Sequence, residues 1–412
     1  MGNPSTSILR HRDFRFFIAA RFFMVLAFTI QATVVGLQIY DLTGSMLDLG
    51  LVGLVEAIPS IIVSFYAGHL ADLKDRKSII LICLGFLFLC SASLLAFAGP
   101  LFFLLEKFGV YPILFVIFIS GIARGFISPS IFSFVIQIVP REHYPHSAAW
   151  MGTVFQAGAV LGPGLAGILY GWAGIQAAYI LDCVCIGLPF LLFLLIKRRP
   201  LPERNEKEPL FKSLAAGIKF VWNNEIMLGA MALDMFAVLF GGAVALIPVF
   251  AKDILHVGPE GVGLLRASQS IGALLMAFYL TRKPPLQKSG KLLLGSVIGF
   301  GLCMICFGIS TLFWVSVAAI FLSGVFDSVS VVIRSTIMQT MTPEDMRGRV
   351  SAINKIFIGS SNEIGSFESG VTAEAFGPIV SVVLGGAITL LVVAIAAKKA
   401  PKLGSLELKE WL

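Results

Sequence analysis

The chain has 412 residues, of which 57% are hydrophobic and 13% charged, and its formal net charge is +7. Soluble domains usually contain about 25% charged residues, so this composition excludes an ordinary soluble protein and predicts a polytopic membrane protein. The positive charge requires no nucleic acid partner, because basic cytoplasmic loops are usual in membrane proteins.

Twelve apolar segments are each long enough to cross a hydrocarbon core about 30 Å thick at about 1.5 Å per residue. They predict an all-α protein with spans at approximately residues 14–40, 46–69, 78–98, 110–139, 146–171, 174–196, 226–250, 260–280, 291–309, 312–339, 348–370 and 377–397. Most Lys and Arg residues fall in the N-terminus, the even-numbered loops and the C-terminus, whereas the odd-numbered loops hold only Lys107 and Lys252. The positive-inside rule therefore predicts that both termini are cytoplasmic.

Residues 68–77, between the second and third predicted spans, are interpreted as a tight cytoplasmic loop. They resemble the loop signature Gly-x-Leu-Ala-Asp-Arg-x-Gly-Arg-Lys of the major facilitator superfamily, with Leu73 and Asp75 departing from it. Asp75 at this position is similar to the loop variant Asp-Arg-x-Asp-Arg-Arg, which is found in the branch that holds enterobactin-type siderophore exporters and macrolide efflux proteins. We expect Asp72 to act in a cytoplasmic gate. The matching residues are Gly68, Leu70, Ala71, Asp72, Arg76 and Lys77.

The two halves of the chain match at a constant offset of 203 positions, as in Gly121 with Gly324, Gly167 with Gly370 and Gly174 with Gly377. Such a repeat is typical of the two six-helix bundles of major facilitator transporters. We therefore predict bundles at residues 1–196 and 226–397, a linker at 197–225 and a cytoplasmic tail at 398–412. Apolar residues at helical spacing predict an amphipathic surface helix in the linker, with a loosely packed segment as the alternative.

Two further segments carry the resemblance. Residues 158–167 are similar to the superfamily's antiporter motif through Gly158, Gly162, Pro163 and Gly167. Small residues four apart let helices approach closely in lipid, and a proline bends the span, although plain helix packing is an alternative reading. Residues 342–349 are similar to the segment before span eleven of the exporter branch, with Thr342 as the expected helix cap.

Ionisable residues inside spans are costly and are therefore candidates for function. Counting from the span ends places Glu56, Arg124, Asp327 and Glu363 near the middle third, and Asp182, Asp234, Arg21 and Arg266 closer to the ends. We predict that the proton-coupling set comprises Glu56, Arg124, Asp327, Glu363 and Asp234. The preferred pair is Glu56 with Arg124, and a permanent ion pair that locks two helices is the alternative.

These features favour a proton-coupled exporter of an amphipathic small molecule, such as a siderophore or drug, that works by alternating access. A lysophospholipid flippase and an uptake symporter on the same fold are the alternatives. The sequence has no zinc motif, no Gly-x-Ser-x-Gly elbow and no P-loop, so we expect neither enzymatic activity nor a cofactor. We expect no metal at Cys303 and Cys306, which lie within a predicted span. The expected setting is a monomer in the bacterial inner membrane.

Overall fold

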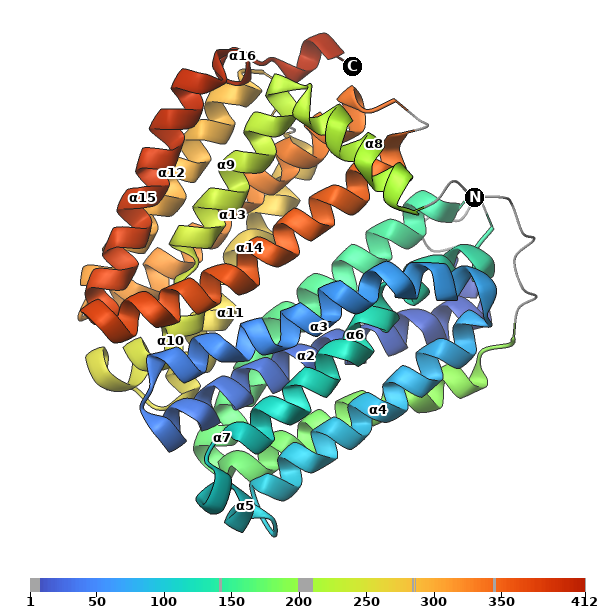
Figure 1. The fold of residues 1–412 in the computed structure, drawn as a ribbon, viewed down its shortest axis with the longest axis vertical. Coiled ribbons are helices and arrows are strands. Elements are labelled where there is room, and N and C mark those ends of the chain that lie inside the picture. The colour runs from blue at the N-terminus through green and yellow to red at the C-terminus, as the bar shows by residue number, and fades with distance from the viewer. Residues whose placement is uncertain are drawn as a thin grey trace. The chain divides into compact units, whose positions relative to one another are not determined.

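The computed structural model describes residues 8–140, 143–198, 210–283, 285, 287–343 and 346–411, and within these ranges it contains helices and no strands (Figure 1). The predicted all-α class is therefore confirmed. In the N-terminal half the elements are η1 (Ile8–Arg10), α2 (Arg12–Thr43), α3 (Met46–Leu73), α4 (Arg76–Phe97), α5 (Phe102–Phe108), α6 (Tyr111–Ile138) and α7 (Tyr144–Leu195).

The C-terminal half begins with α8 (Leu210–Trp222), which lies where an amphipathic helix is predicted. Its location on a membrane surface stays a prediction. The other elements are α9 (Glu225–Gly241), η3 (Ala243–Leu246), α10 (Ile247–Val249), η4 (Phe250–Ile254), α11 (Pro259–Arg282), α12 (Ser289–Ile309), α13 (Phe313–Met341), α14 (Arg347–Phe376), α15 (Pro378–Lys399), α16 (Pro401–Gly404) and η6 (Leu408–Trp411).

Ten stretches of the described chain are helical, long and apolar enough to cross a membrane. One of them, within α7, contains two predicted spans, because the backbone breaks at Gly174. The eleventh predicted span corresponds to α14, which is long enough but is not among the ten. A multi-pass membrane protein is thus confirmed, whereas the count of twelve spans stays a prediction.

The backbone shows the internal repeat directly at two glycines. Gly174 has φ 82° and Gly377 has φ 86°, and the two lie 203 positions apart. L-residues with a side chain rarely adopt such angles, so glycine is required at both breaks. Each break separates the last two long helical segments of its half of the sequence.

The chain divides into two compact units. Unit 1 contains residues 1–44, 54–204 and 258–267, and unit 2 contains residues 45–53, 205–257 and 268–412. Two helices pass from one unit into the other: α3 begins in unit 2 and continues in unit 1, and α11 begins in unit 1 and continues in unit 2.

Each unit has its own apolar core. In unit 1, α2 packs along α7, and α4 packs against α6 and α7. Phe17, Phe134 and Phe193 form a buried aromatic cluster with ring centroids 5.7–6.3 Å apart. In unit 2, α12 packs against α13 and α15, and α9 packs against α14 and α15. Met227, Leu293 and Ile333 are among the side chains at the centre of this second core.

Two local predictions are wrong. The ten-residue loop at 68–77 is in fact two residues long, because α3 continues to Leu73 and α4 begins at Arg76. Asp75 explains the sharp start of α4: its carboxylate accepts hydrogen bonds from the Lys77 N–H and from the Ser78 hydroxyl, at 3.2 and 2.7 Å. The helix expected to begin after Thr342 begins at Arg347, and Thr342 instead follows the last residue of α13.

Candidate functional site

The site in unit 1 depends on a close crossing of α3 and α6. A Cβ added at Gly121 would clash with the Glu56 carbonyl oxygen, and one at Gly125 would lie 2.7 Å from the Ser60 carbonyl oxygen. Glycine at 121 and 125 therefore lets the two backbones touch. The close crossing brings the Glu56 side chain of α3 within reach of Arg124, which follows Gly121 by one turn of α6.

Arg124 is at the centre of a polar network. One guanidinium nitrogen forms an ion pair with Glu56, and another donates a hydrogen bond to the Gln31 amide oxygen of α2. The guanidinium carbon also lies 4.3 Å from the ring centroid of Phe28. The Glu56 and Arg124 side chains are 24% and 16% exposed, so the pair is only partly shielded within the described structure. The preferred pair from the sequence is in direct contact; its role in coupling stays a prediction.

The polar network continues behind Arg124. The Gln31 amide nitrogen donates to the Ser91 hydroxyl of α4 at 3.3 Å. Gln31 and Ser91 line a small cavity together with Asp182 of α7. Asp182, placed nearer a span end by the sequence count, is completely buried in unit 1.

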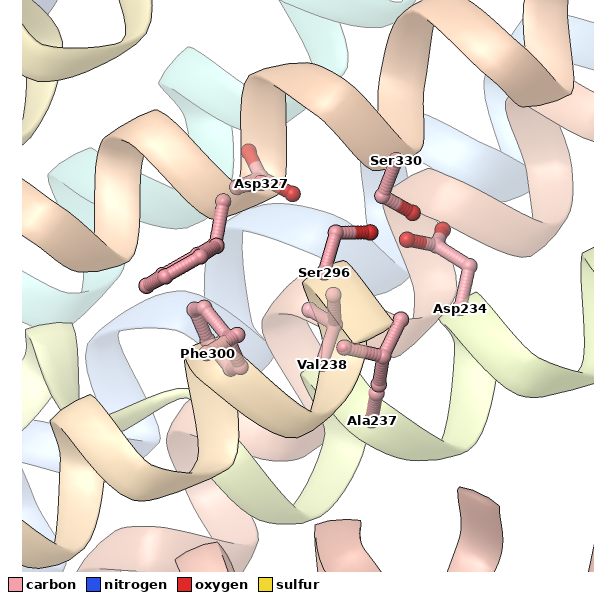
Figure 2. A pocket seen from close by; sticks show the side chains of 9 residues that line it. Asp234, Ala237, Val238, Ser296, Phe300, Asp327 and Ser330 are labelled. Carbon is pink, nitrogen blue, oxygen red and sulfur yellow. The ribbon is translucent and has the colours of Figure 1, made fainter. Parts of the chain in front are cut away.

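Unit 2 contains a second ion pair, between Asp234 of α9 and Arg334 of α13, and this pair is buried. The two residues are 6% and 5% exposed. Asp234 also lines a pocket with Ser296, Phe300, Asp327 and Ser330, among other residues. In Figure 2 the oxygens of Asp234, Ser296 and Ser330 point toward one another, and Asp327 lies on the far side of Ser296. Asp327 and Asp234 of the predicted set therefore share one pocket.

Glu363 belongs neither to the polar network around Arg124 nor to the pocket that Asp234 and Asp327 line. Its carboxylate lies against Gly53, near the start of α3, where an added Cβ would come within 2.5 Å of an oxygen. Glu363 and this part of α3 both belong to unit 2. A nearby acid, Glu374, accepts hydrogen bonds from the Met46 and Leu47 N–H groups at 2.9 and 3.3 Å. Glu374 thus caps the N-terminus of α3, where a carboxylate is favoured by the helix dipole.

The glycines of the antiporter-like segment lie at helix contacts. A Cβ at Gly158 would lie 2.7 Å from Val25, and one at Gly162 would clash with the Thr29 hydroxyl, both on α2. The hydroxyl of Thr29 accordingly donates to the Gly158 carbonyl at 3.1 Å.

Gly167 faces a different helix, α11. A Cβ there would lie 2.9 Å from the Gly263 Cα, and a Cβ built on Gly263 would lie 2.6 Å from the Pro163 carbonyl oxygen. Unit 2 repeats this contact between Gly50 of α3 and Gly370 of α14, where each added Cβ would lie 3.0–3.2 Å from the opposite Cα. Gly167 and Gly370 are 203 positions apart, so the same crossing recurs in both units.

Replacement of Gly167 by leucine is expected to reduce transport strongly while membrane insertion stays intact, because the side chain has no space against α11. Overpacking of this kind costs typically about 1–3 kcal/mol. Gly164→Leu is the matched control, since a Cβ at Gly164 meets nothing within 4 Å. Transport by equal amounts of inserted protein is the measurement. Equal activity of the two variants would mean that the glycine contact has no part in the cycle.

The loop residues Arg76 and Lys77 hold helix ends together. The Arg76 guanidinium donates to the Ser133 carbonyl of α6 at 2.9 Å. The Lys77 ammonium, 7% exposed, donates to the Leu194 carbonyl at 3.1 Å and to the Ile196 carbonyl, at the C-terminal end of α7. A cation there is favoured by the helix dipole. The side chain of Asp72 and the surroundings of Gly68 lie outside the described part of the structure, so the gate at Asp72 stays a prediction.

Lys77→Met is expected to destabilise the protein by about 1.5–3 kcal/mol, since two carbonyls would lose charged hydrogen-bond donors. Lys74→Met in the same loop is the control, because Lys74 is exposed. Thermal unfolding in detergent compares the two variants. A Lys77→Met variant as stable as Lys74→Met would show that these bonds contribute little.

Sequence reasoning missed Gln31 and Arg334. The sequence nevertheless contains an indication of each. Arg334 is an ionisable residue within the predicted span 312–339, two helical turns after Asp327. Gln31 lies 203 positions before Asp234. The repeat therefore relates Gln31, which binds Arg124 in unit 1, to Asp234, which binds Arg334 in unit 2.

Comparisons with known proteins agree with these features. Residues 4–410 match the protein family described as "Transmembrane secretion effector". The chain is 26% identical, over 352 residues, to the enterobactin exporter EntS of Citrobacter koseri, covering 83% of this chain and 81% of that protein. An enterobactin exporter EntS from Escherichia coli O1:K1 / APEC matches with the same identity and coverage.

Solved transporter structures share the fold. A bacterial homologue of the human lysosomal transporter Spinster superimposes with a TM-score of 0.74 at 14% identity, covering 100% of this chain and 99% of that chain. A POT family transporter in complex with 5-aminolevulinic acid gives a TM-score of 0.75 at 10% identity, covering 95% and 96%. The family match spans nearly the whole sequence, and the fold is that of these transporters. The chain therefore belongs to the transmembrane secretion effector family of the major facilitator superfamily, and is a transporter rather than an enzyme.

Proposed function

We propose that this transporter is a secondary active exporter that exchanges protons for an amphipathic small molecule, with a siderophore as the first substrate class to test. The observation that carries the proposal is the partly exposed ion pair between Glu56 and Arg124 inside the helices of unit 1. The similarity to enterobactin exporters over most of the chain supports the substrate class and the direction.

The chemistry of the pair fits proton coupling. A carboxylate beside an arginine is stabilised in its charged form, and protonation removes the attraction between the two groups. Glu56 is on α3 and Arg124 is on α6, so a change in the protonation of Glu56 changes the force that holds these helices together. The guanidinium remains charged, and Gln31 and Phe28 stay as its partners.

Alternating access would use α3 and α11, the two helices that begin in one unit and continue in the other. At Gly50 and at Gly263 the nearest atoms of α14 and α7 are backbone atoms. Contacts without side chains can slide or separate with little loss of specific interactions. We propose that the protein works as a monomer in a bacterial inner membrane with both termini in the cytoplasm, as the distribution of basic residues supports.

Inside-out membrane vesicles test the function. With the wild-type protein, a pH gradient that is acidic inside should drive enterobactin into the vesicles, and collapse of the gradient with a protonophore should abolish the uptake. Vesicles that carry the Gly167→Leu variant are a control for leakage. Uptake that ignores the gradient would contradict proton coupling.

The alternatives give different results in the same preparation. Enterobactin that leaves the vesicles together with protons would indicate a symporter. If enterobactin does not move but a labelled lysophospholipid changes leaflet, the protein is a flippase.

A further inference from the structure

Asp182 is an acid with unusual surroundings. It lies on α7 inside unit 1 and is 0% exposed, and neither carboxyl oxygen has a hydrogen-bond partner within the described ranges. The cavity beside it is lined by Ala27, Phe28, Gln31, Leu87, Ser91 and Ile186. This lining contains no cation, and an ionised carboxylate that is buried without a paired charge is strongly unfavourable.

A continuous series of side chains connects this cavity to the ion pair. Gln31 donates to Ser91 at 3.3 Å and accepts a hydrogen bond from Arg124, which in turn contacts Glu56. Ser91 and Gln31 also approach Asp182 closely enough to interact electrostatically, although not with the geometry of a hydrogen bond. Small rotations of the Gln31 amide would therefore alter the surroundings of both acids.

The charged and titratable groups around Asp182 are few. Among the residues that the structure describes, Arg124 of α6 is the cation that acts on it, and Tyr179, Cys183 and Cys185 are neighbours on its own helix. From α2 and α4 it is faced by the uncharged side chains of Gln31 and Ser91. The charge of Arg124 thus acts on two acids, Glu56 through an ion pair and Asp182 through the field around the cavity.

We propose that Asp182 holds a proton in this conformation, and that Asp182 and Glu56 share this one proton by competing for Arg124. This inference rests on the proposed proton-coupled function and names a second acid for the same site. In the exchange, the O–H bond at Asp182 breaks and an O–H bond forms at Glu56, while the ion pair of Arg124 passes from Glu56 to Asp182. One acid is neutral and one is charged at each stage, so the three groups together stay uncharged.

Infrared difference spectroscopy tests the resting state without any transport. The spectrum of wild-type protein minus that of Asp182→Asn, at neutral pH in detergent, should contain the carbonyl band of a protonated carboxylic acid. Asparagine has nearly the shape of a protonated aspartic acid, so the variant should remain folded, as judged by size-exclusion chromatography. A difference spectrum that contains only carboxylate bands would overturn the proposal.

A second pair of variants tests the competition. In the Glu56→Gln background Arg124 has lost its acidic partner, so Asp182 should now be ionised. The difference between Glu56→Gln and the double variant Glu56→Gln/Asp182→Asn should therefore contain carboxylate bands and no protonated carbonyl band. Persistence of the protonated band in this background would show that Asp182 does not compete for Arg124.

Transport separates this inference from the proposed function. Asp182→Asn should lose pH-driven enterobactin transport and keep substrate exchange, which needs no net proton movement. Full pH-driven transport by Asp182→Asn would overturn the shared-proton proposal while leaving proton-coupled export intact. If the wild-type protein itself ignores the pH gradient, the proposed function fails, and the infrared spectra alone then decide whether Asp182 carries a proton.

Discussion

Replacement of Asp234 by alanine is expected to destabilise the protein by about 3–5 kcal/mol, because it leaves a charge buried without a partner. Arg334 is 5% exposed, and its ion pair with Asp234 is the charge compensation that would be lost. The change can be measured as the shift in denaturant-induced unfolding in detergent micelles. The exposed acid Glu106 provides a matched control, and Glu106→Ala should change stability by less than about 0.5 kcal/mol.

A double variant distinguishes loss of the pair from loss of Asp234 itself. Asp234→Ala/Arg334→Met removes both charges, and apolar replacement of a buried ion pair is often close to neutral. We therefore expect the double variant to recover most of the lost stability. A double variant as unstable as Asp234→Ala would show that the pair is not what Asp234 contributes to the fold.

Glu56→Gln is expected to abolish transport driven by a pH gradient while substrate exchange continues. Glutamine keeps the size and part of the hydrogen bonding of the side chain, but it cannot release or bind the proton that coupling requires. The variant should stay folded, because Arg124 retains Gln31 and Phe28 as partners. The measurement is enterobactin uptake into inside-out vesicles with and without an imposed pH gradient, followed by counterflow of labelled against unlabelled substrate.

Two other variants limit the interpretation of this result. Asp327→Asn and Glu363→Gln remove two further acids of the candidate set, both in unit 2, and leave Asp234 in place. Retention of full pH-driven transport by these two variants and by Glu56→Gln would mean that all three acids are structural. Coupling would then have to involve Asp182 or Asp234, or a different driving force.

Much of the fold could be predicted because membrane spans are specified locally. A run of apolar residues determines a span. Glycine itself indicates a close helix contact, as at Gly121 and Gly167, or a backbone break with positive φ, as at Gly174, where φ is 82°. The pairing of Glu56 with Arg124 is predictable from the sequence too, since both lie near the middle of spans in the same predicted bundle, where few other charges compete.

The parts that could not be predicted depend on contacts between distant residues. Arg334 is paired with Asp234, a hundred positions earlier, and depth along a span does not indicate which way either side chain points. Asp182 was placed nearer a span end by its position, yet packing of α2 and α4 against α7 buries it completely. The loop at 68–77 was predicted too long because its polar residues extend into the last turns of α3.

The most direct test of the central claim is the sign of proton movement that accompanies substrate. The purified protein is reconstituted into liposomes that contain a pH-sensitive dye and enterobactin, with none outside. If the protein exchanges protons for substrate, efflux of enterobactin should acidify the lumen of wild-type liposomes and leave that of Glu56→Gln liposomes unchanged. Efflux from wild-type liposomes without a pH change, or with the lumen becoming alkaline, would contradict proton-coupled exchange.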